Sequence, residues 1–95
     1  MTSNDFEFWS AEMNLSTPTI DIHGLRPSEA AEKIEHFIDL QLMGPYKSVR
    51  IVHGAGTGAL RDMVQKLLRQ NTHILAQKES GQVHELAAVT YAILK

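Results

Sequence analysis

The stretch Ile51-Val52-His53-Gly54-Ala55-Gly56-Thr57-Gly58-Ala59-Leu60 joins a β-branched run, residues 49–52, to an amphipathic segment. In that segment apolar residues recur at the i, i+3, i+4, i+7 and i+8 spacing of one helix face: Leu60, Met63, Val64, Leu67 and Leu68. Residues 53–58 are therefore predicted to form a strand-to-helix turn. Glycine permits positive φ and close backbone approach, and free N–H groups at a helix start favour anions such as phosphate. The stretch predicts an anion-binding turn.

The composition is that of one small domain. The chain has 95 residues, no Cys and a formal net charge of −2. These values exclude a disulfide framework and a Cys-based metal site, and they speak mildly against avid non-specific binding to nucleic acid. Residues 1–15 carry acidic but no basic side chains, which is unlike a signal or transit peptide, and no apolar run is long enough to span a membrane. We expect a soluble, cytoplasmic protein.

Charge is unevenly distributed along the chain. Residues 1–40 hold eight of the 11 acidic residues, whereas residues 41–95 hold seven of the nine basic residues. The basic residues nearest the Gly-rich turn in sequence are Lys47, Arg50, Arg61, Lys66 and Arg69. This asymmetry is compatible with one basic face that contacts nucleic acid. It is also compatible with a solvated helix surface, and charge alone favours that second interpretation.

Residues 1–18 are predicted to be an N-terminal accessory segment, separate from a domain over residues 19–95. Phe6, Trp9 and Met13 fit one stripe of a short helix, capped by Ser3 or Asn4 and ended before Thr17-Pro18. We expect this stripe to pack on the domain. The alternative is a motif that docks a partner, for example the ribosome or another protein.

The remaining pattern predicts strands and helices in the order β-α-β-α-β-β. The predicted strands are residues 19–23, 48–52, 74–78 and 87–94, and the predicted helices are residues 27–42 and 59–70. This order predicts a compact two-layer α/β sandwich with a mixed four-stranded sheet. Its predicted core consists of Ile20, Ile22, Ile34, Phe37, Ile38, Val49, Ile51, Met63, Val64 and Leu67.

A second His-Gly pair precedes the first predicted helix. Ile22-His23-Gly24 and Val52-His53-Gly54 are thirty residues apart, which is about one β-α unit. A β-α-β crossover makes the two strands parallel, so both end at the same edge of the sheet, where open α/β sheets bind ligands. We therefore expect Asp21, His23 and His53 to lie near one another. A P-loop lysine and a Gly-x-Gly-x-x-Gly dinucleotide fingerprint are both absent.

The two motifs together resemble those of the Smr (small MutS-related) domain family. Ile20-Asp21-Ile22-His23-Gly24 is similar to the family's Leu-Asp-Leu-His-Gly, and residues 53–58 match its His-Gly-x-Gly-Thr-Gly. The resemblance covers about residues 19–95. It implies a fold similar to the C-terminal domain of translation initiation factor 3, and an endonuclease that nicks DNA or cleaves RNA. It also implies functional roles for Asp21, His23, His53, Gly54, Gly56, Thr57 and Gly58.

The residue types suit phosphodiester cleavage. Two imidazoles that titrate near neutrality can share the roles of base and acid, so Asp21, His23 and His53 are the expected catalytic residues. Asp21 would either fix the tautomer of His23 through a hydrogen bond or bind a divalent metal ion. No third protein ligand is evident, so no cofactor is certain. The expected phosphate contacts are Gly54, Gly56, Thr57, Gly58, Arg61 and Lys66. The side chains of both motif histidines are expected to project toward solvent.

Several alternatives remain open at this point. A non-catalytic module that binds RNA or DNA fits the same residues, and a small phosphorylated ligand would fit the turn alone. An Asp-x-His pair is often structural. His36, His73 and His84 lack any such context and are interpreted as surface or packing residues. We expect a monomer that contacts nucleic acid and does not associate with membranes.

Overall fold

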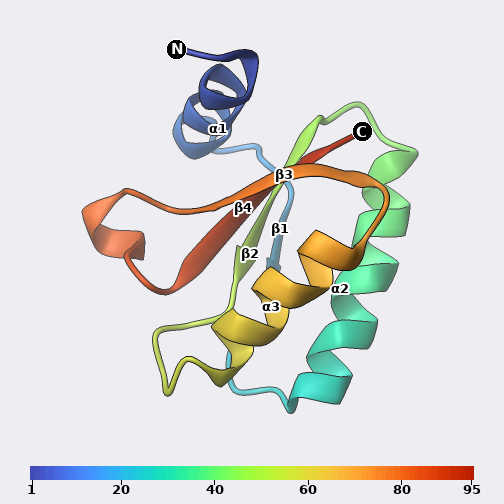
Figure 1. Cartoon of the computed structure of the whole chain (residues 1–95), viewed down its shortest axis with the longest axis vertical. Helices are drawn as coiled ribbons and strands as arrows, with labels where there is room; N and C mark the ends of the chain where they lie inside the picture. The colour runs from blue at the N-terminus through green and yellow to red at the C-terminus, as the bar shows by residue number, and fades with distance from the viewer.

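The computed structural model describes residues 1–95 as a four-stranded mixed sheet with helices on both of its faces (Figure 1). None of its helices has the length and apolar character needed to cross a membrane. The elements, in chain order, are α1 (Ser3–Met13), β1 (Thr19–Asp21), α2 (Pro27–Leu42), β2 (Ser48–Val52), α3 (Ala59–Gln70), β3 (Ile74–Glu79), a short 3₁₀ helix η1 (Val83–Glu85) and β4 (Val89–Leu94).

The strands lie in the order β1-β2-β4-β3. β1 pairs in parallel with β2, and β4 is antiparallel to both β2 and β3. The predicted order of elements and the mixed sheet are confirmed. The last strand in sequence thus lies inside the sheet, and every residue of β4 is buried because helices cover both faces. This burial on both faces explains why residues 89–94 are almost continuously apolar and lack the alternation of a half-buried strand.

One core lies between the sheet and the pair α2 and α3. Of the predicted core residues, six are fully buried there and four others, Ile20, Phe37, Met63 and Leu67, pack against them while remaining partly accessible. A second core, which the sequence pattern did not predict, lies on the opposite face. There Phe8 and Ala11 of α1 pack against Val89, Tyr91 and Ile93 of β4.

Helix α1 is present as predicted, but its N-cap lies one residue earlier than predicted. A different face of the helix packs against the sheet. Its N-cap is Thr2, which exchanges hydrogen bonds with Asp5 in a capping box, rather than Ser3 or Asn4. The predicted packing stripe is wrong. Phe6, Trp9 and Met13 are each more than half exposed, because Phe8 and Ala11 occupy the face that meets the sheet.

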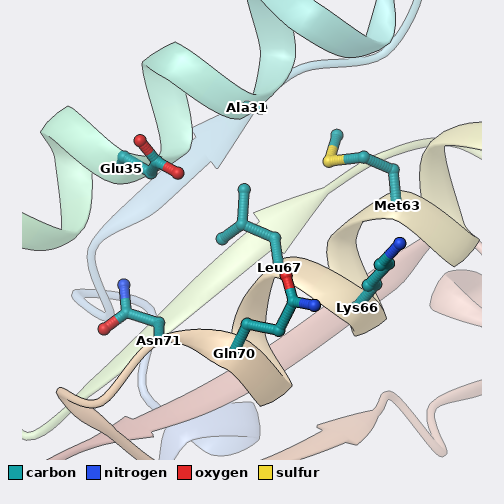
Figure 2. Close-up of a pocket in the computed structure, with 7 residues that line it drawn as sticks. All are labelled: Ala31, Glu35, Met63, Lys66, Leu67, Gln70 and Asn71. Atoms are coloured by element: carbon teal, nitrogen blue, oxygen red, sulfur yellow. The ribbon is translucent and has the colours of Figure 1, made fainter.

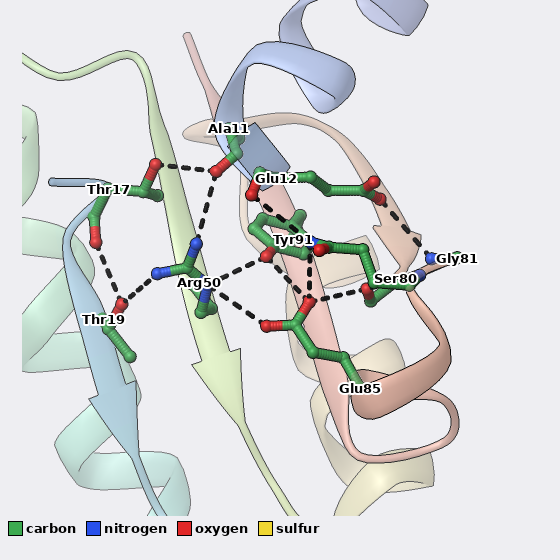
Figure 3. A network of polar contacts seen from close by, with 10 residues as sticks. Ala11, Glu12, Thr17, Thr19, Arg50, Ser80, Gly81, Glu85 and Tyr91 are labelled. Carbon is green, nitrogen blue, oxygen red and sulfur yellow. Dashed lines mark hydrogen bonds and ion pairs between the residues drawn. The ribbon is translucent and has the colours of Figure 1, made fainter. Parts of the chain in front are cut away.

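Polar contacts attach α1 to the sheet (Figure 3). The carbonyl of Ala11 accepts hydrogen bonds from Thr17 Oγ1 at 2.8 Å and from Arg50 Nη2 at 3.4 Å. Arg50 Nε donates to the Tyr91 hydroxyl at 2.8 Å and lies 3.6 Å from Glu85. Burial raises the pKa of the Tyr91 phenol, so it stays protonated and donates to Glu85. The N-terminal helix is thus held in a defined position.

Candidate nucleic-acid site

Both His-Gly motifs lie at the same edge of the sheet, as predicted. Asp21 pairs with Val52 across the parallel strands, and the Ile22 amide donates to the Val52 carbonyl at 2.8 Å. The chain then leaves each strand into the walls of one shared cleft of about 490 Å³. The cleft is lined by residues 23–25, Pro27 and residues 53–61. The parallel crossover therefore brings the two motifs together.

Asp21 orients the ring of His23. The Asp21 carboxylate accepts hydrogen bonds from His23 Nδ1 and, at 3.0 Å, from the His23 backbone amide. These two hydrogen bonds hold the pKa of Asp21 below its ordinary value, and the bond from the His23 ring has the larger effect. The carboxylate is therefore ionised at neutral pH. His23 is 70% exposed, and its Nε2 has no hydrogen-bond partner in the protein. His23 therefore presents a free ring nitrogen beside the cleft.

His53 does not project toward solvent, and that prediction is wrong. The residue is 3% exposed, and both of its ring nitrogens are engaged inside the protein. Nδ1 lies 3.0 Å from the Gly54 carbonyl oxygen, and Nε2 lies 2.9 Å from Thr90 Oγ1. The ring turns inward because β4 lies beside β2 and offers the Thr90 hydroxyl. The two histidines of the motifs are thus in different environments.

The three glycines of the turn differ in whether the backbone geometry requires a glycine at their positions. Gly54 and Gly58 have φ values of +78° and +90°, which residues with a side chain rarely adopt. Gly54 also lies directly against the Cβ of His23. Gly56 has no positive φ, and a Cβ there would meet nothing within 4 Å. Only the first and last glycines are therefore demanded by the fold itself.

The turn carries a row of unpaired backbone donors. The amide N–H groups of residues 55–58, and those of Leu60 and Arg61 in the first turn of α3, have no hydrogen-bond partner within the protein. The Ala59 amide makes a long bond of 3.4 Å to Thr57 Oγ1. Free N–H groups at a helix start, together with the helix dipole, attract anions. This geometry fits a phosphate group in the cleft.

The two predicted basic contacts lie in different places. Arg61 lines the cleft, where Glu79 at 3.5 Å and Asp62 at 3.8 Å offset part of its charge. Lys66 lies outside the cleft. Figure 2 shows it in a separate groove between α2 and α3, which Glu35 lines from α2. The structure therefore brings Arg61, but not Lys66, to the two motifs.

Three further polar residues lie behind the cleft, and no motif in the sequence marks them. Gln65 of α3 donates to Thr90 of β4, and Gln77 of β3 donates to Gln65. Their positions depend on the insertion of β4 between β2 and β3. No group of three or more His, Asp or Glu side chains is placed to hold a metal ion. Asp21 and His23 alone would offer two ligands, and they are bonded to each other.

Comparisons with known proteins agree with this geometry. A model of the Smr domain family matches residues 20–95. Endonuclease MutS2 of Exiguobacterium sibiricum is 34% identical over 84 residues, which are 88% of this chain but 11% of that protein. Endonuclease MutS2 of Halalkalibacterium halodurans is 42% identical over 64 residues, or 67% of this chain and 8% of that protein. The chain thus spans about a tenth of the length of these relatives.

Solved structures show the same fold. The Smr domain of Thermus thermophilus MutS2 superposes with a TM-score of 0.80 at 24% identity, covering 83% of this chain and 99% of that one. YdaL, a stand-alone small MutS-related protein from Escherichia coli, gives a TM-score of 0.75 at 18% identity, covering 84% of this chain and 66% of that one. With the match over residues 20–95, these likenesses identify the chain as a member of the Smr domain family.

Proposed function

We propose that this chain is an endonuclease that cleaves RNA in the cleft between its two His-Gly motifs. One observation carries the proposal: an imidazole that is oriented by a carboxylate and has a free Nε2 lines the same cleft as a turn of unpaired amide donors. Relatives named endonuclease MutS2 support a nuclease. RNA is favoured over DNA because its 2′-OH supplies a nucleophile, whereas the cleft offers no three-ligand metal cluster.

In the proposed reaction, His23 Nε2 accepts the proton of a ribose 2′-OH as the 2′ oxygen attacks the adjacent phosphorus. The P–O5′ bond breaks, which leaves a 2′,3′-cyclic phosphate and a 5′-OH. The leaving oxygen takes its proton from the imidazolium or from water. Asp21 holds the ring in position and stabilises the imidazolium. The reaction needs one proton-transfer group from the protein, and His23 is the one that is accessible.

Several of the remaining site residues are assigned to phosphate binding. The Gly54 amide is not among the donors, because it already donates to the Ala88 carbonyl at 3.0 Å. The amides of residues 55–58, which include Gly56, Thr57 and Gly58, would donate to the non-bridging oxygens, and Arg61 would offset the charge that develops on phosphorus. Because its ring is buried and fully bonded, His53 is assigned to positioning rather than to proton transfer. Lys66 is left as a contact for a longer nucleic acid outside the cleft.

The test is cleavage of end-labelled single-stranded RNA and of a DNA oligonucleotide of the same sequence, with and without EDTA. We expect cleavage of RNA alone, insensitive to EDTA, with 2′,3′-cyclic or 3′-phosphate ends. His23→Gln should lower kcat by about 10²-fold or more, the range for loss of a proton-transfer group. His36→Gln, an exposed histidine on α2, is the matched control. Full activity of His23→Gln would eliminate the mechanism, and cleavage that EDTA abolishes would replace it with a metal-dependent one.

A second candidate is a nucleic-acid-binding module without catalysis. It is favoured by two observations: only one motif histidine is accessible, and carboxylates already neutralise part of the charge of Arg61. In the same experiment, RNA that is bound by the wild-type protein but remains intact would select this function.

We also propose that the exposed stripe of α1, formed by Phe6, Trp9 and Met13, docks the protein onto a cytoplasmic partner such as the ribosome. The helix carries Asp5, Glu7 and Glu12 and no basic residue, so its partner surface would be apolar with a basic rim. Two copies of this acidic face would repel each other, which supports a monomer.

Cosedimentation with purified ribosomes tests this docking proposal. Loss of sedimentation in Trp9→Ser, with unchanged cleavage of free RNA, is the expected result. Cosedimentation equal to that of the wild type would contradict it.

A further inference from the structure

A buried line of polar side chains runs behind the phosphate-binding turn. His53 is 3% exposed and Thr90 is fully buried. Thr90 Oγ1 lies 2.9 Å from His53 Nε2, and Gln65 Nε2 donates to the same oxygen at 2.9 Å. Gln77 Nε2 in turn donates to the Gln65 carbonyl at 2.9 Å and lies 3.3 Å from its side-chain oxygen. No buried polar side-chain atom of the protein lacks a hydrogen-bond partner.

Only one arrangement of the polar hydrogens satisfies all the hydrogen bonds in this line of side chains. The Gly54 carbonyl can only accept, so the proton of a neutral His53 must lie on Nδ1. Nε2 is then an acceptor and receives the hydroxyl proton of Thr90. The Thr90 oxygen keeps its lone pairs for the amide of Gln65, and Gln77 fixes the orientation of Gln65. The Gly54 carbonyl and the side chains of Thr90, Gln65 and Gln77 together therefore specify one tautomer of His53.

This tautomer bears on the orientation of the turn. The Nδ1–H group holds the Gly54 carbonyl toward the interior. In a planar trans peptide the carbonyl and the following N–H point in opposite directions. Holding the Gly54 carbonyl inward therefore directs the Ala55 N–H outward, as the first of the unpaired amides of residues 55–58. A peptide flip at this point would remove one donor from the row and displace the others.

We propose that Thr90 and Gln65 are positioning residues of the phosphate-binding turn, and that they act by fixing His53 as the Nδ1–H tautomer. The functional part of this inference rests on the proposed RNA binding, whereas the tautomer does not. Neither residue touches the cleft. Loss of either side chain is expected to weaken the binding of phosphate more than it slows proton transfer by His23.

The test compares Thr90→Val, which has the same shape but no hydroxyl, with Thr90→Ser, which keeps one, and with Gln65→Leu. Thr72→Val, at an exposed threonine that follows the C-terminal end of α3 and does not line the cleft, is the control for the substitution itself. The first readout is the ¹⁵N spectrum of the histidine rings at mildly alkaline pH, which distinguishes the two neutral tautomers. The second is RNA cleavage, resolved into KM and kcat, with affinity measured on a 2′-O-methyl RNA that cannot be cleaved.

We expect the Nδ1–H tautomer at His53 in the wild type, and shifted backbone amide signals for residues 54–58 in Thr90→Val. In that variant KM and Kd should rise about tenfold, as one or two lost phosphate hydrogen bonds would produce, while kcat falls less than KM rises. Thr90→Ser should restore both constants, and Gln65→Leu should resemble Thr90→Val. His53→Asn, whose amide N–H replaces Nδ1–H, should bind more tightly than His53→Ala.

An Nε2–H tautomer in the wild type would overturn the proposal, and so would Thr90→Val with unchanged turn signals and unchanged KM. A fall in kcat alone in Thr90→Val would instead assign proton transfer to His53. If the wild-type protein neither binds nor cleaves RNA, the proposed function fails. The ring and amide spectra then still decide whether Thr90 and Gln65 hold the turn. If Thr90→Val does not fold, the proposal is decided by Gln65→Leu and by the tautomer of His53 in the wild-type protein.

Discussion

A β-carbon placed on Gly54 would lie 3.2 Å from the Cβ of His23, a separation tighter than most Cβ contacts in proteins. The glycine of the second motif is thus demanded by the position of the histidine in the first. The parallel pairing of β1 with β2 creates this contact, because it places the ends of the two strands side by side. The two motifs form one structural unit.

Gly54→Ala should therefore damage both fold and function. Its φ of +78° and the contact with His23 together are expected to lower the free energy of unfolding by about 1–3 kcal/mol. Gly56→Ala is the matched control for stability, because its Cβ would meet nothing within 4 Å and its φ is not positive. Urea unfolding and RNA affinity measure the two effects. Stability that falls equally in both variants would contradict the close approach of Gly54 to His23.

Salt dependence should separate Arg61 from Lys66. Arg61→Ala is expected to weaken RNA binding. It should also reduce the slope of log Kd against log salt by the amount that corresponds to the loss of about one phosphate contact. Lys66→Ala should change the slope less on a short RNA, because Lys66 lies in the groove between α2 and α3. Ala55→Lys places a cation at the cleft and should strengthen binding. Equal slopes for all three variants and the wild type would move the nucleic acid away from this cleft.

Asp21 predicts a particular acid dependence of stability. Its pKa is lower in the folded than in the unfolded chain, so ionisation stabilises the fold above the ordinary value of 3.8. This contribution is lost as the pH falls through the lowered pKa. The urea midpoints of wild type and Asp21→Asn should therefore differ above about pH 5 and converge only as the pH falls below 3.8 and through the lowered pKa of Asp21. The difference should be small, because the side chain is half exposed, and a gap that widens in acid would contradict this sign.

Glu85 should be a main determinant of the attachment of α1 and of the segment before β4. Its carboxylate accepts from Ser80, Gln82 and Tyr91 and pairs with Arg50 in a mostly buried position. Glu85→Ala leaves these partners unsatisfied and is expected to cost about 2–3 kcal/mol of stability. Glu85→Gln keeps an acceptor and should cost less. Urea unfolding followed by Trp9 fluorescence measures the loss, with Glu32→Ala on α2 as the exposed control. A cost no larger than that of Glu32→Ala would refute this role.

The local sequence pattern determined much of the secondary structure and the place of the cleft in this protein. Helical periodicity and the flanking Gly and Pro residues predicted α2 and α3 close to their observed bounds, because propensity and capping act over a few neighbouring residues. The spacing of the two His-Gly motifs predicted a shared sheet edge, because it fits one β-α-β crossover, and such a crossover joins parallel strands. The family and the residues that line the cleft could be proposed from the same motifs.

Contacts between distant segments decided the rest. The insertion of β4 between β2 and β3 buried the ring of His53 against Thr90, and this left His23 as the accessible imidazole of the pair. The docking of Phe8 on β4 turned Trp9 and its neighbours outward. A histidine after a strand, or an aromatic residue on a helix, has the same local pattern whether it faces water or a partner strand. Its environment depends on which strand the sheet places beside it, and this is a property of the tertiary structure alone.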